Sequence, residues 1–366
     1  MKVIVGSLQY SPIFKSHCCA FGKQAEMSGH SVKYLFSRKY AWMLDEDIKK
    51  KAVFFGDSES LPTSLIDGIN YRLLQEIAEF ILRESPDVIY LHNIHPLNYH
   101  IAKFAKAHDI MFIQHIHEPF VEDKSAYGGF HQYFIYIFEY LQGKLLEVTD
   151  VAVVSSGIAV NLFKRRYPNY SGKLILIPLM YEDFGKHSAL SENRQYITFI
   201  GPPVPAKGPE TFLKIVDYSN HHDLSLQYLL ISRYPIDDHF CGIPNLTLYH
   251  KDQISDPEMA ELLHQSLMTI TPYTTARQSS VVLTSYMCGT PVLSSDIDGL
   301  RESVYHLKTG YLVDLRAPIE AWINGIEYIS NNFEIMSNNC RSDFVANYSE
   351  INWQKYLSQI LRGKND

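Results

Sequence analysis

One lysine stands in a loop that could bind a phosphate group. Gly201 ends a short apolar run, and Lys207 and Gly208 come directly before Pro209, a residue that suits the first turn of a helix. The free backbone N–H groups of that turn and the Lys207 ammonium could bind the same anion. A rigid loop with a solvated lysine is the alternative interpretation.

A second polar loop offers similar chemistry. Arg277 is followed by Ser279 and Ser280, which are typical N-cap residues for the apolar stretch that starts at Val281. A helix start beside an arginine is a second possible anion site. Ordinary helix capping explains the two serines equally well.

His117 and Glu118 could do acid–base chemistry. They follow the apolar run 111–116 and place an imidazole next to a carboxylate. Such a pair can act as a general base or hold a substrate hydroxyl. A histidine that makes only local hydrogen bonds is the alternative.

Further histidines raise the question of a metal. His92, His95 and His100 follow the apolar run 87–91. Their spacing matches no metal motif, and no cysteine or paired carboxylate completes a site. We therefore expect no metal ion.

Short apolar runs alternate with longer stretches of helical periodicity and would position these side chains. The runs in the first half of the chain are 2–8, 31–36, 87–91, 111–116 and 150–155. Those in the second half are 196–200, 225–231, 246–249, 268–271 and 292–294. This alternation is typical of an α/β protein whose parallel sheets are covered by helices on both faces. Ligands bind such sheets beyond the carboxyl ends of the strands, where the polar residues above lie.

The chain is long enough for two domains. It has 366 residues, of which 46% are hydrophobic and 20% charged. A polar stretch at 181–194 has no clear period and suits a linker. We predict an N-terminal Rossmann-like domain at 1–180, a second at 181–343, and a closing helix at 344–366 that returns to the first.

Charge and cysteine usage argue against some classes of protein. The formal net charge of -7 argues against a general nucleic-acid binder. The five cysteines form no pattern of a disulfide framework, and the first residues lack the pattern of a signal peptide, so we expect a cytoplasmic protein. No apolar run approaches the roughly 20 residues of a membrane-spanning helix, so any membrane contact would be peripheral.

An aromatic stretch has the period of a helix. Six apolar residues recur at helical spacing, namely Phe130, Tyr133, Phe134, Ile137, Phe138 and Leu141. We predict that this stripe faces the core. A face directed at lipid or at an acceptor molecule is the alternative.

Several strings resemble the family four glycosyltransferases, which are retaining enzymes with the GT-B fold. The resemblance is strongest at 197–210 and at 287–296, the latter followed by Gly299, Glu302 and 309–313. Weaker matches lie at 29–32, 117–119, 154–156 and 344–361. The resemblance implies two Rossmann-like domains that face each other across a cleft. It also implies that Lys207 holds the diphosphate of a nucleotide sugar, and that His117 contacts the transferred sugar.

The chain departs from the family pattern at the donor site. Pro202 stands where the family has a second phosphate-binding residue, an arginine. Ala276 and Thr284 stand at the two glutamates of the Glu-x7-Glu motif, and Arg277 follows the first of them. We expect Arg277 to replace the missing arginine. Because Thr284 cannot accept bonds from both ribose hydroxyls as a glutamate can, a deoxyribose donor such as a dTDP-sugar is favoured.

We predict a glycosyltransferase that moves a sugar from a nucleotide-sugar donor to a saccharide or lipid-linked acceptor. The resemblance implies cell-surface polysaccharide synthesis, in the cytoplasm or at the inner membrane face, without cofactor or metal. The predicted catalytic residues are His117 and Glu118. The predicted donor contacts are Gly201, Lys207, Gly208, Arg277, Ser279, Ser280, Thr284 and Glu302. A catalytically silent glycan-binding or scaffold subunit is the alternative function, and a nucleotide-sugar epimerase on the same fold is a third.

Overall fold

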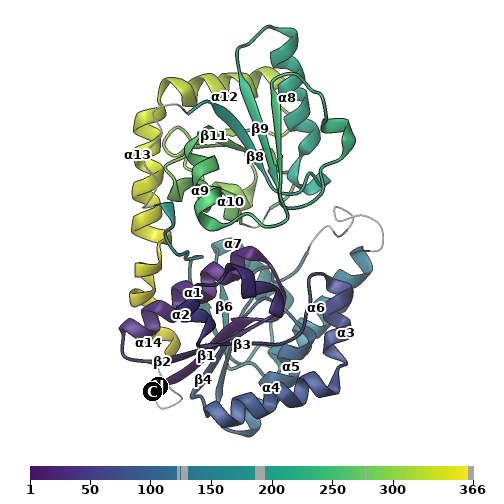
Figure 1. The fold of residues 1–366 in the computed structure, drawn as a ribbon, viewed down its shortest axis with the longest axis vertical. Coiled ribbons are helices and arrows are strands. Elements are labelled where there is room, and N and C mark those ends of the chain that lie inside the picture. Colours follow the sequence, from purple (N-terminus) through teal and green to yellow (C-terminus); the bar gives the residue numbers. More distant parts are fainter. Residues whose placement is uncertain (122–123, 125–130, 186–193, 277, 362–366) are drawn as a thin grey trace. The chain divides into compact units, whose positions relative to one another are not determined.

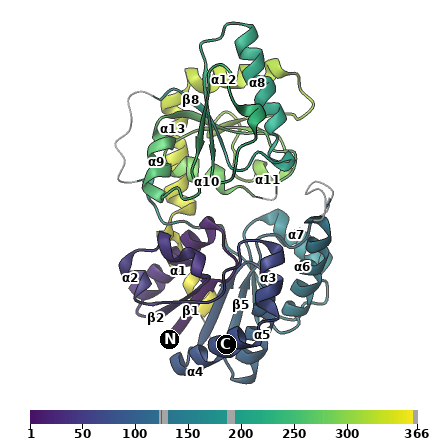
Figure 2. The same ribbon diagram turned by 45° about the vertical axis from the view of Figure 1, so that its right-hand side comes forward.

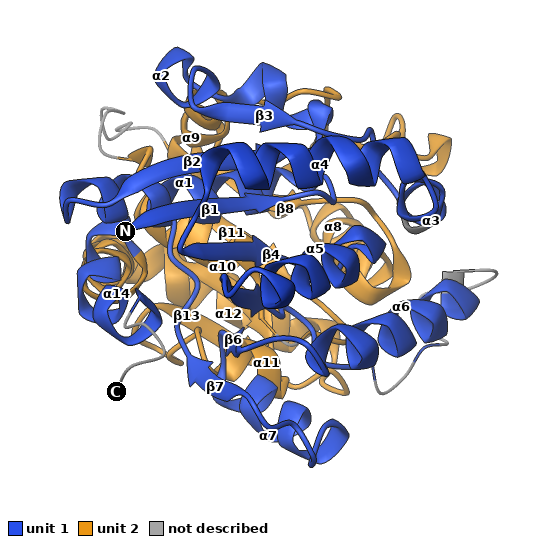
Figure 3. Ribbon diagram, turned by 90° about the horizontal axis from the view of Figure 1, so that it is seen from below, with its two compact units in different colours: residues 1–182, 349–366 blue, residues 183–348 orange. Residues whose placement is uncertain are grey.

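A computed structural model describes residues 1–121, 124, 131–185, 194–276 and 278–361. The chain divides into two compact units (Figures 1 and 3). Unit 1 consists of Met1–Glu182 and Ser349–Asp366, and unit 2 of Asp183–Tyr348. Each unit has its own parallel sheet covered by helices, so the predicted α/β class with two doubly wound sheets is confirmed. Part of the predicted linker, 186–193, lies outside the described residues.

The described part of unit 1 contains a seven-stranded parallel sheet in the order β3-β2-β1-β4-β5-β6-β7. Its strands are β1 (Lys2–Ser7), β2 (Ser31–Phe36), β3 (Ala52–Phe54), β4 (Val88–His92), β5 (Met111–His115), β6 (Val151–Val154) and β7 (Lys173–Leu176). Its helices are α1 (Pro12–Met27), α2 (Glu46–Lys49), α3 (Leu61–Gly68), α4 (Tyr71–Glu84), α5 (Pro96–Ala107), α6 (His131–Leu146), α7 (Gly157–Arg166) and α14 (Gln354–Leu361). The strand order reverses between β1 and β4, which makes that position the switch point of the sheet.

Both faces of the unit 1 sheet are buried. Val3 and Val5 of β1 pack in one core cluster with α1, whereas Ile4 packs in a second cluster with α4 and α5. Figure 2 shows α1 and α2 on one side of the sheet and α3, α5 and α6 on the other. Burial on both faces explains why the strands form near-continuous apolar runs in the sequence.

The sequence predicted a single closing helix at 344–366, but the structure shows several shorter elements there. Phe344–Tyr348 form a π-helical segment that follows α13 directly, and Glu350–Trp353 form a short 3-10 helix before α14 begins. The Trp353 ring packs edge-on against Phe21 of α1 at 5.1 Å between centroids, and Leu357 and Ile360 join the same core. The chain therefore returns to unit 1 at Ser349 through short helical segments that place Trp353 in the core.

The described part of unit 2 contains a six-stranded parallel sheet in the order β10-β9-β8-β11-β12-β13. Its strands are β8 (Tyr196–Ile200), β9 (Gln227–Ser232), β10 (Leu246–His250), β11 (Ser266–Thr271), β12 (Val292–Ser295) and β13 (Gly310–Val313). Its helices are α8 (Pro209–His221), α9 (Asp256–His264), α10 (Ser280–Met287), α11 (Asp298–Arg301), α12 (Ile319–Asn331) and α13 (Phe333–Asp343). Helices α8 and α12 lie beside each other on one face (Figure 1), and α9 packs on the other face. The switch point of this sheet lies between β8 and β11.

The predicted orientation of the aromatic helix is wrong. In α6 the buried apolar residues are Ile135, Phe138, Leu145 and Leu146, whereas Tyr133 and Ile137 of the predicted stripe are exposed. Phe138 is the member of that stripe that reaches the core. Phe130 lies outside the described residues. Apolar residues occur on every side of this helix, so periodicity could not distinguish its buried face.

Candidate functional site

Two loops pack together at the switch point of the unit 2 sheet. Gly208, which follows β8, has a φ of +66°, and a Cβ atom at this position would lie 1.8 Å from the carbonyl oxygen of Pro272, which follows β11. The Thr274 N–H donates to the carbonyl of Ala206 at 3.2 Å. Gly201 at the end of β8 has a φ of +118°, which L side chains rarely adopt. Glycine is therefore required for this close packing of the two loops.

The packing fixes the position of Lys207. Its Nζ lies 3.9 Å from the centroid of the Tyr273 ring, a cation–π contact between the two loops. Pro209 is the first residue of α8, as the sequence predicted. The lysine is therefore half-buried and held against an aromatic ring.

The start of α10 provides hydrogen-bond donors on the β11 side of the switch point. Ser279 is in the N-cap position, but its side chain makes no capping bond, and its buried Oγ has no hydrogen-bond partner among the described residues. The first N–H groups of the helix thus lack the side-chain cap that the sequence predicted. Ser280, the first helical residue, is half-buried. An anion at this helix start would satisfy these N–H groups.

The remaining predicted donor contacts are Thr284, Glu302 and Arg277, all in the sequence of unit 2. Thr284 is half-buried on α10, one turn after the helix start. Glu302 is exposed directly after α11 and lies close enough to Tyr348 to affect its pKa, which burial raises above the usual value. Arg277 lies outside the described residues.

Four imidazoles gather at the carboxyl edge of the unit 1 sheet. His92 and His115 end the neighbouring strands β4 and β5, His117 follows β5, and His17 comes from α1. Ring centroids are 4.7 Å apart for His92 and His115 and 4.5 Å apart for His115 and His117. Burial lowers the pKa of all four histidines, that of His17 to about 4. They are therefore neutral at pH 7, and His117 is suited to exchange hydrogen bonds rather than to supply a positive charge.

Sequence reasoning found His117 but not its partners. It grouped His92 with His95 and His100, whereas the structure places His92 beside His115. The pairing of β4 with β5 aligns His92 with His115. Both histidines lie at the ends of consecutive apolar runs, but only the pairing of the two strands brings them together.

His95 has a local role. Its Nδ1 accepts the N–H of Leu97 at the start of α5, so Nε2 carries the proton and donates to Ser58 Oγ at 3.1 Å. Ser58 in turn donates to Asp67. Because the carboxylate accepts from the serine and not from the histidine, this chain of bonds does not have the order of a catalytic triad.

We expect the His95 relay to make stability depend on pH. Burial lowers the pKa of His95 to about 3, against about 6.5 for an unfolded histidine. Below pH 6.5 the unfolded chain binds a proton that the folded chain does not, so the free energy of unfolding falls as the pH falls toward 3. His95→Gln removes this contribution, which we expect to be on the order of 3 kcal/mol between pH 7 and pH 4. Urea unfolding at both pH values measures it, and equal pH dependence in the variant and the wild type would refute it.

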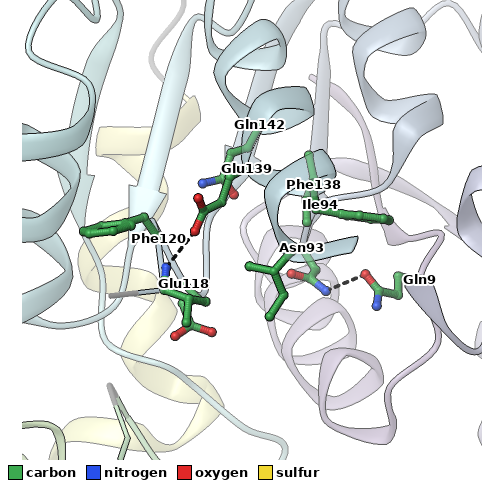
Figure 4. A pocket seen from close by; sticks show the side chains of 10 residues that line it. Gln9, Asn93, Ile94, Glu118, Phe120, Phe138, Glu139 and Gln142 are labelled. Carbon is green, nitrogen blue, oxygen red and sulfur yellow. Dashed lines mark hydrogen bonds between the residues drawn. The ribbon is translucent and has the colours of Figure 1, made fainter. Parts of the chain in front are cut away.

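A pocket opens in unit 1, and Glu118, which follows His117 in the chain, is one of its lining residues (Figure 4). It is a cavity of about 250 Å³ at the switch point between β1 and β4. Amide and carboxylate groups line one part of it, and apolar side chains line the rest. The lining residues are Gln9, Asn93, Ile94, Glu118, Phe120, Val121, Ile135, Phe138, Glu139 and Gln142.

Some polar groups of the pocket are held by hydrogen bonds (Figure 4). Asn93 Nδ2 donates to Gln9 Oε1 at 2.9 Å, and Glu139 accepts the Val121 N–H at 2.9 Å. The two residues of the predicted catalytic pair separate here: His117 joins the imidazoles, and Glu118 lines the cavity. A cavity with a polar part and an apolar part suits a saccharide, which has hydroxyl groups and apolar ring faces.

Comparison with known families decides the assignment. The model for "Glycosyltransferase Family 4" matches residues 15–180, and the model for "Glycosyl transferases group 1" matches residues 194–332. The two matches together show a glycosyltransferase like those of family four. The predicted resemblance is thereby confirmed, and one model falls within each unit of this glycosyltransferase.

Individual relatives are distant. The D-inositol 3-phosphate glycosyltransferase of Paenarthrobacter aurescens is 23% identical over 179 residues, which are 45% of this chain and 42% of that protein. The sucrose-phosphate synthase structure from Thermosynechococcus elongatus has a TM-score of 0.74 at 14% identity, with 99% of each chain covered. Anabaena HepE in complex with UDP-glucose has a TM-score of 0.70 at 12% identity, again with 99% of each chain covered. The two structures share the GT-B fold with this glycosyltransferase.

The helices of the described residues were compared with the length and hydropathy that a membrane span requires. None of the helices there has both the length and the apolar character to cross a bilayer.

Proposed function

We propose that this glycosyltransferase moves a sugar from a nucleotide-sugar donor bound by unit 2 to a saccharide or lipid-linked acceptor bound by unit 1. One observation supports the proposal most. Each unit gathers its candidate polar residues at the switch point of a parallel sheet, where doubly wound folds bind their ligands. The structure of HepE in complex with UDP-glucose adds support for the donor class.

The donor loops can stabilise a leaving diphosphate. Lys207 is fixed by Tyr273, and the N–H groups at the start of α10 lack a side-chain cap. Departure of the diphosphate develops negative charge on its oxygen atoms, and fixed donors stabilise that charge without reorganising during the reaction. Arg277 would add a second cation from the other donor loop, which follows β11, and Thr284 favours a deoxyribose donor.

The exposed tyrosines of α6 indicate what kind of acceptor this protein uses. Tyr133, Tyr136 and Tyr140 are each more than half exposed, while Phe138 of the same helix lines the pocket. Tyrosines are suited to a boundary between water and lipid, since they have an apolar ring and a polar tip. This arrangement supports a lipid-linked acceptor, as in cell-surface polysaccharide assembly, with the protein acting in the cytoplasm at the inner membrane face.

A silent scaffold is the second candidate function. Ala276 and Thr284 replace both carboxylates of the family motif, and neither side chain can do the acid–base chemistry of a glutamate. A scaffold would keep the fold and a glycan pocket without turnover.

Turnover separates the two functions. We would incubate the full chain with UDP-, GDP-, dTDP- and CMP-sugars, with and without oligosaccharide acceptors, and measure the free nucleotide released. The transferase predicts release from one donor, faster with an acceptor. No release from any donor by a folded protein would favour the scaffold.

Glu118→Gln should impair transfer selectively. The glutamate lines the pocket in unit 1, so its loss should lower the acceptor-dependent rate by about 100-fold, the lower end for general acid–base catalysis. Nucleotide affinity should not change, because the donor loops are in unit 2. Glu79→Gln, on the exposed side of α4, is the control. A parallel loss of nucleotide binding would contradict a role for Glu118 at the acceptor.

A further inference from the structure

Three imidazoles of unit 1 lie close enough to share a ligand. One nitrogen atom from each of His92, His115 and His117 lies within 4.8 Å of the other two. His92 and His115 are about 1% exposed, and His117 is half-buried. The group is therefore largely shielded from solvent, and His117 is its least buried member.

The surroundings of His92 point to a missing partner. Both of its ring nitrogens are buried, and neither has a hydrogen-bond partner among the described residues. A buried polar group without a partner costs free energy, and such groups are rare in native proteins. A bound metal ion would accept the lone pair of one His92 nitrogen.

His115 has the support that a ligand histidine usually has. Its Nδ1 lies 2.7 Å from the hydroxyl oxygen of the buried Tyr90, and its Nε2 lies 2.6 Å from Ser155 Oγ. If Nδ1–H donates to Tyr90, the Nε2 lone pair faces Ser155 and becomes available once that hydroxyl turns away. Such outer-shell bonds fix the tautomer and orientation of metal-binding histidines.

The donor set selects the class of metal. Three imidazoles without a carboxylate suit zinc or a similar transition-metal ion and not the oxygen-binding Mg²⁺ or Ca²⁺. His17 contributes a fourth ring, 5.8 Å from His92 and 5.6 Å from His117 between centroids, and its Nδ1–H donates to the Met180 carbonyl at 2.8 Å. It lies outside the group of three, so the protein supplies three ligands.

We propose that His92, His115 and His117 bind one transition-metal ion such as Zn²⁺, with Tyr90 orienting His115. A tetrahedral zinc site with Zn–N bonds of 2.0–2.1 Å places its nitrogens about 3.4 Å apart, so the rings must approach by at most about 1.4 Å on binding. This proposal departs from the expectation of no metal. It rests on the geometry of the histidines, and its test does not need sugar transfer.

The test uses the full chain after removal of metal with a chelator. Titration with Zn²⁺ in a calorimeter should show one ion per chain with a dissociation constant below about 1 μM, and Co²⁺ should give the intense visible absorption of a tetrahedral site. His92→Gln should weaken binding about 100-fold. His108→Gln, an exposed histidine of the same unit, should leave it unchanged.

A second variant guards against misfolding of His92→Gln. Tyr90→Phe removes only the hydroxyl that orients His115 and should weaken Zn²⁺ binding about tenfold, as outer-shell changes do. Zinc binding that is absent or not stoichiometric, or equal affinity in His92→Gln and the wild type, would overturn the proposal. An octahedral Co²⁺ spectrum would also overturn it.

Discussion

Lys207→Ala is expected to lower kcat/KM for sugar transfer by about 10²–10³-fold, the effect of removing one fixed donor from a developing negative charge. The ammonium is held by the Tyr273 ring at the switch point of the unit 2 sheet, so water cannot substitute for it without reorganisation. Steady-state rates with the preferred donor measure the effect.

Two further variants make the lysine result specific. Lys214→Ala removes an exposed lysine from α8 and should leave the rate unchanged. Lys207→Arg keeps the charge and should recover part of the loss. Equal rates for Lys207→Ala and Lys214→Ala would show that the lysine does not act on the diphosphate.

Gly208→Ala is expected to lower the free energy of unfolding by about 3 kcal/mol and to abolish nucleotide binding. The new Cβ would lie 1.8 Å from the Pro272 carbonyl oxygen, so the two donor loops must separate. About 1–2 kcal/mol arises from the left-handed backbone and the remainder from overpacking. Urea unfolding followed by the fluorescence of Trp322, which is buried in unit 2, measures the change.

Gly242→Ala separates the two contributions. Gly242 also has a positive φ, +73°, but no described atom lies within 4 Å of its Cβ position. This variant should show the backbone contribution alone and bind nucleotide normally. Equal destabilisation by the two alanine variants would contradict the tight loop packing.

The sheets could be predicted from the sequence because their strands are buried on both faces. Runs such as 87–91 and 111–116 are short and mostly apolar, and helical stretches separate them. The strand β3 was missed, since Ala52–Phe54 is short and only half-buried at the sheet edge. Strand β13 was recognised as part of a family string and not as a strand.

Local features of the candidate sites could be predicted from the sequence, but contacts between distant segments could not. The loop of Lys207 was predicted because a glycine, a lysine and a proline mark a local turn. Its contact with Tyr273 depends on the pairing of β8 with β11, which lie about 70 residues apart in the chain. The gathering of His92 with His115 depends likewise on strand pairing. Contacts of this kind arise from topology, which local patterns do not contain.

The face of α6 was predicted wrongly for a different reason. Its sequence is apolar or aromatic around most of the helix, and only the packing against the rest of unit 1 determines that Phe138 is buried and Ile137 exposed. Periodicity distinguishes faces only when polar residues occupy one of them.

Calorimetric titration of the wild type and of Lys207→Ala with UDP-, GDP-, dTDP- and CMP-sugars tests donor binding by unit 2 most directly. We predict that the wild type binds one of these nucleotide sugars with a dissociation constant in the micromolar range, and that Lys207→Ala binds it at least about tenfold more weakly, since a charge-assisted contact to the diphosphate is lost. Absence of binding to all four classes by the folded wild-type chain, or equal affinity in the two proteins, would contradict the account.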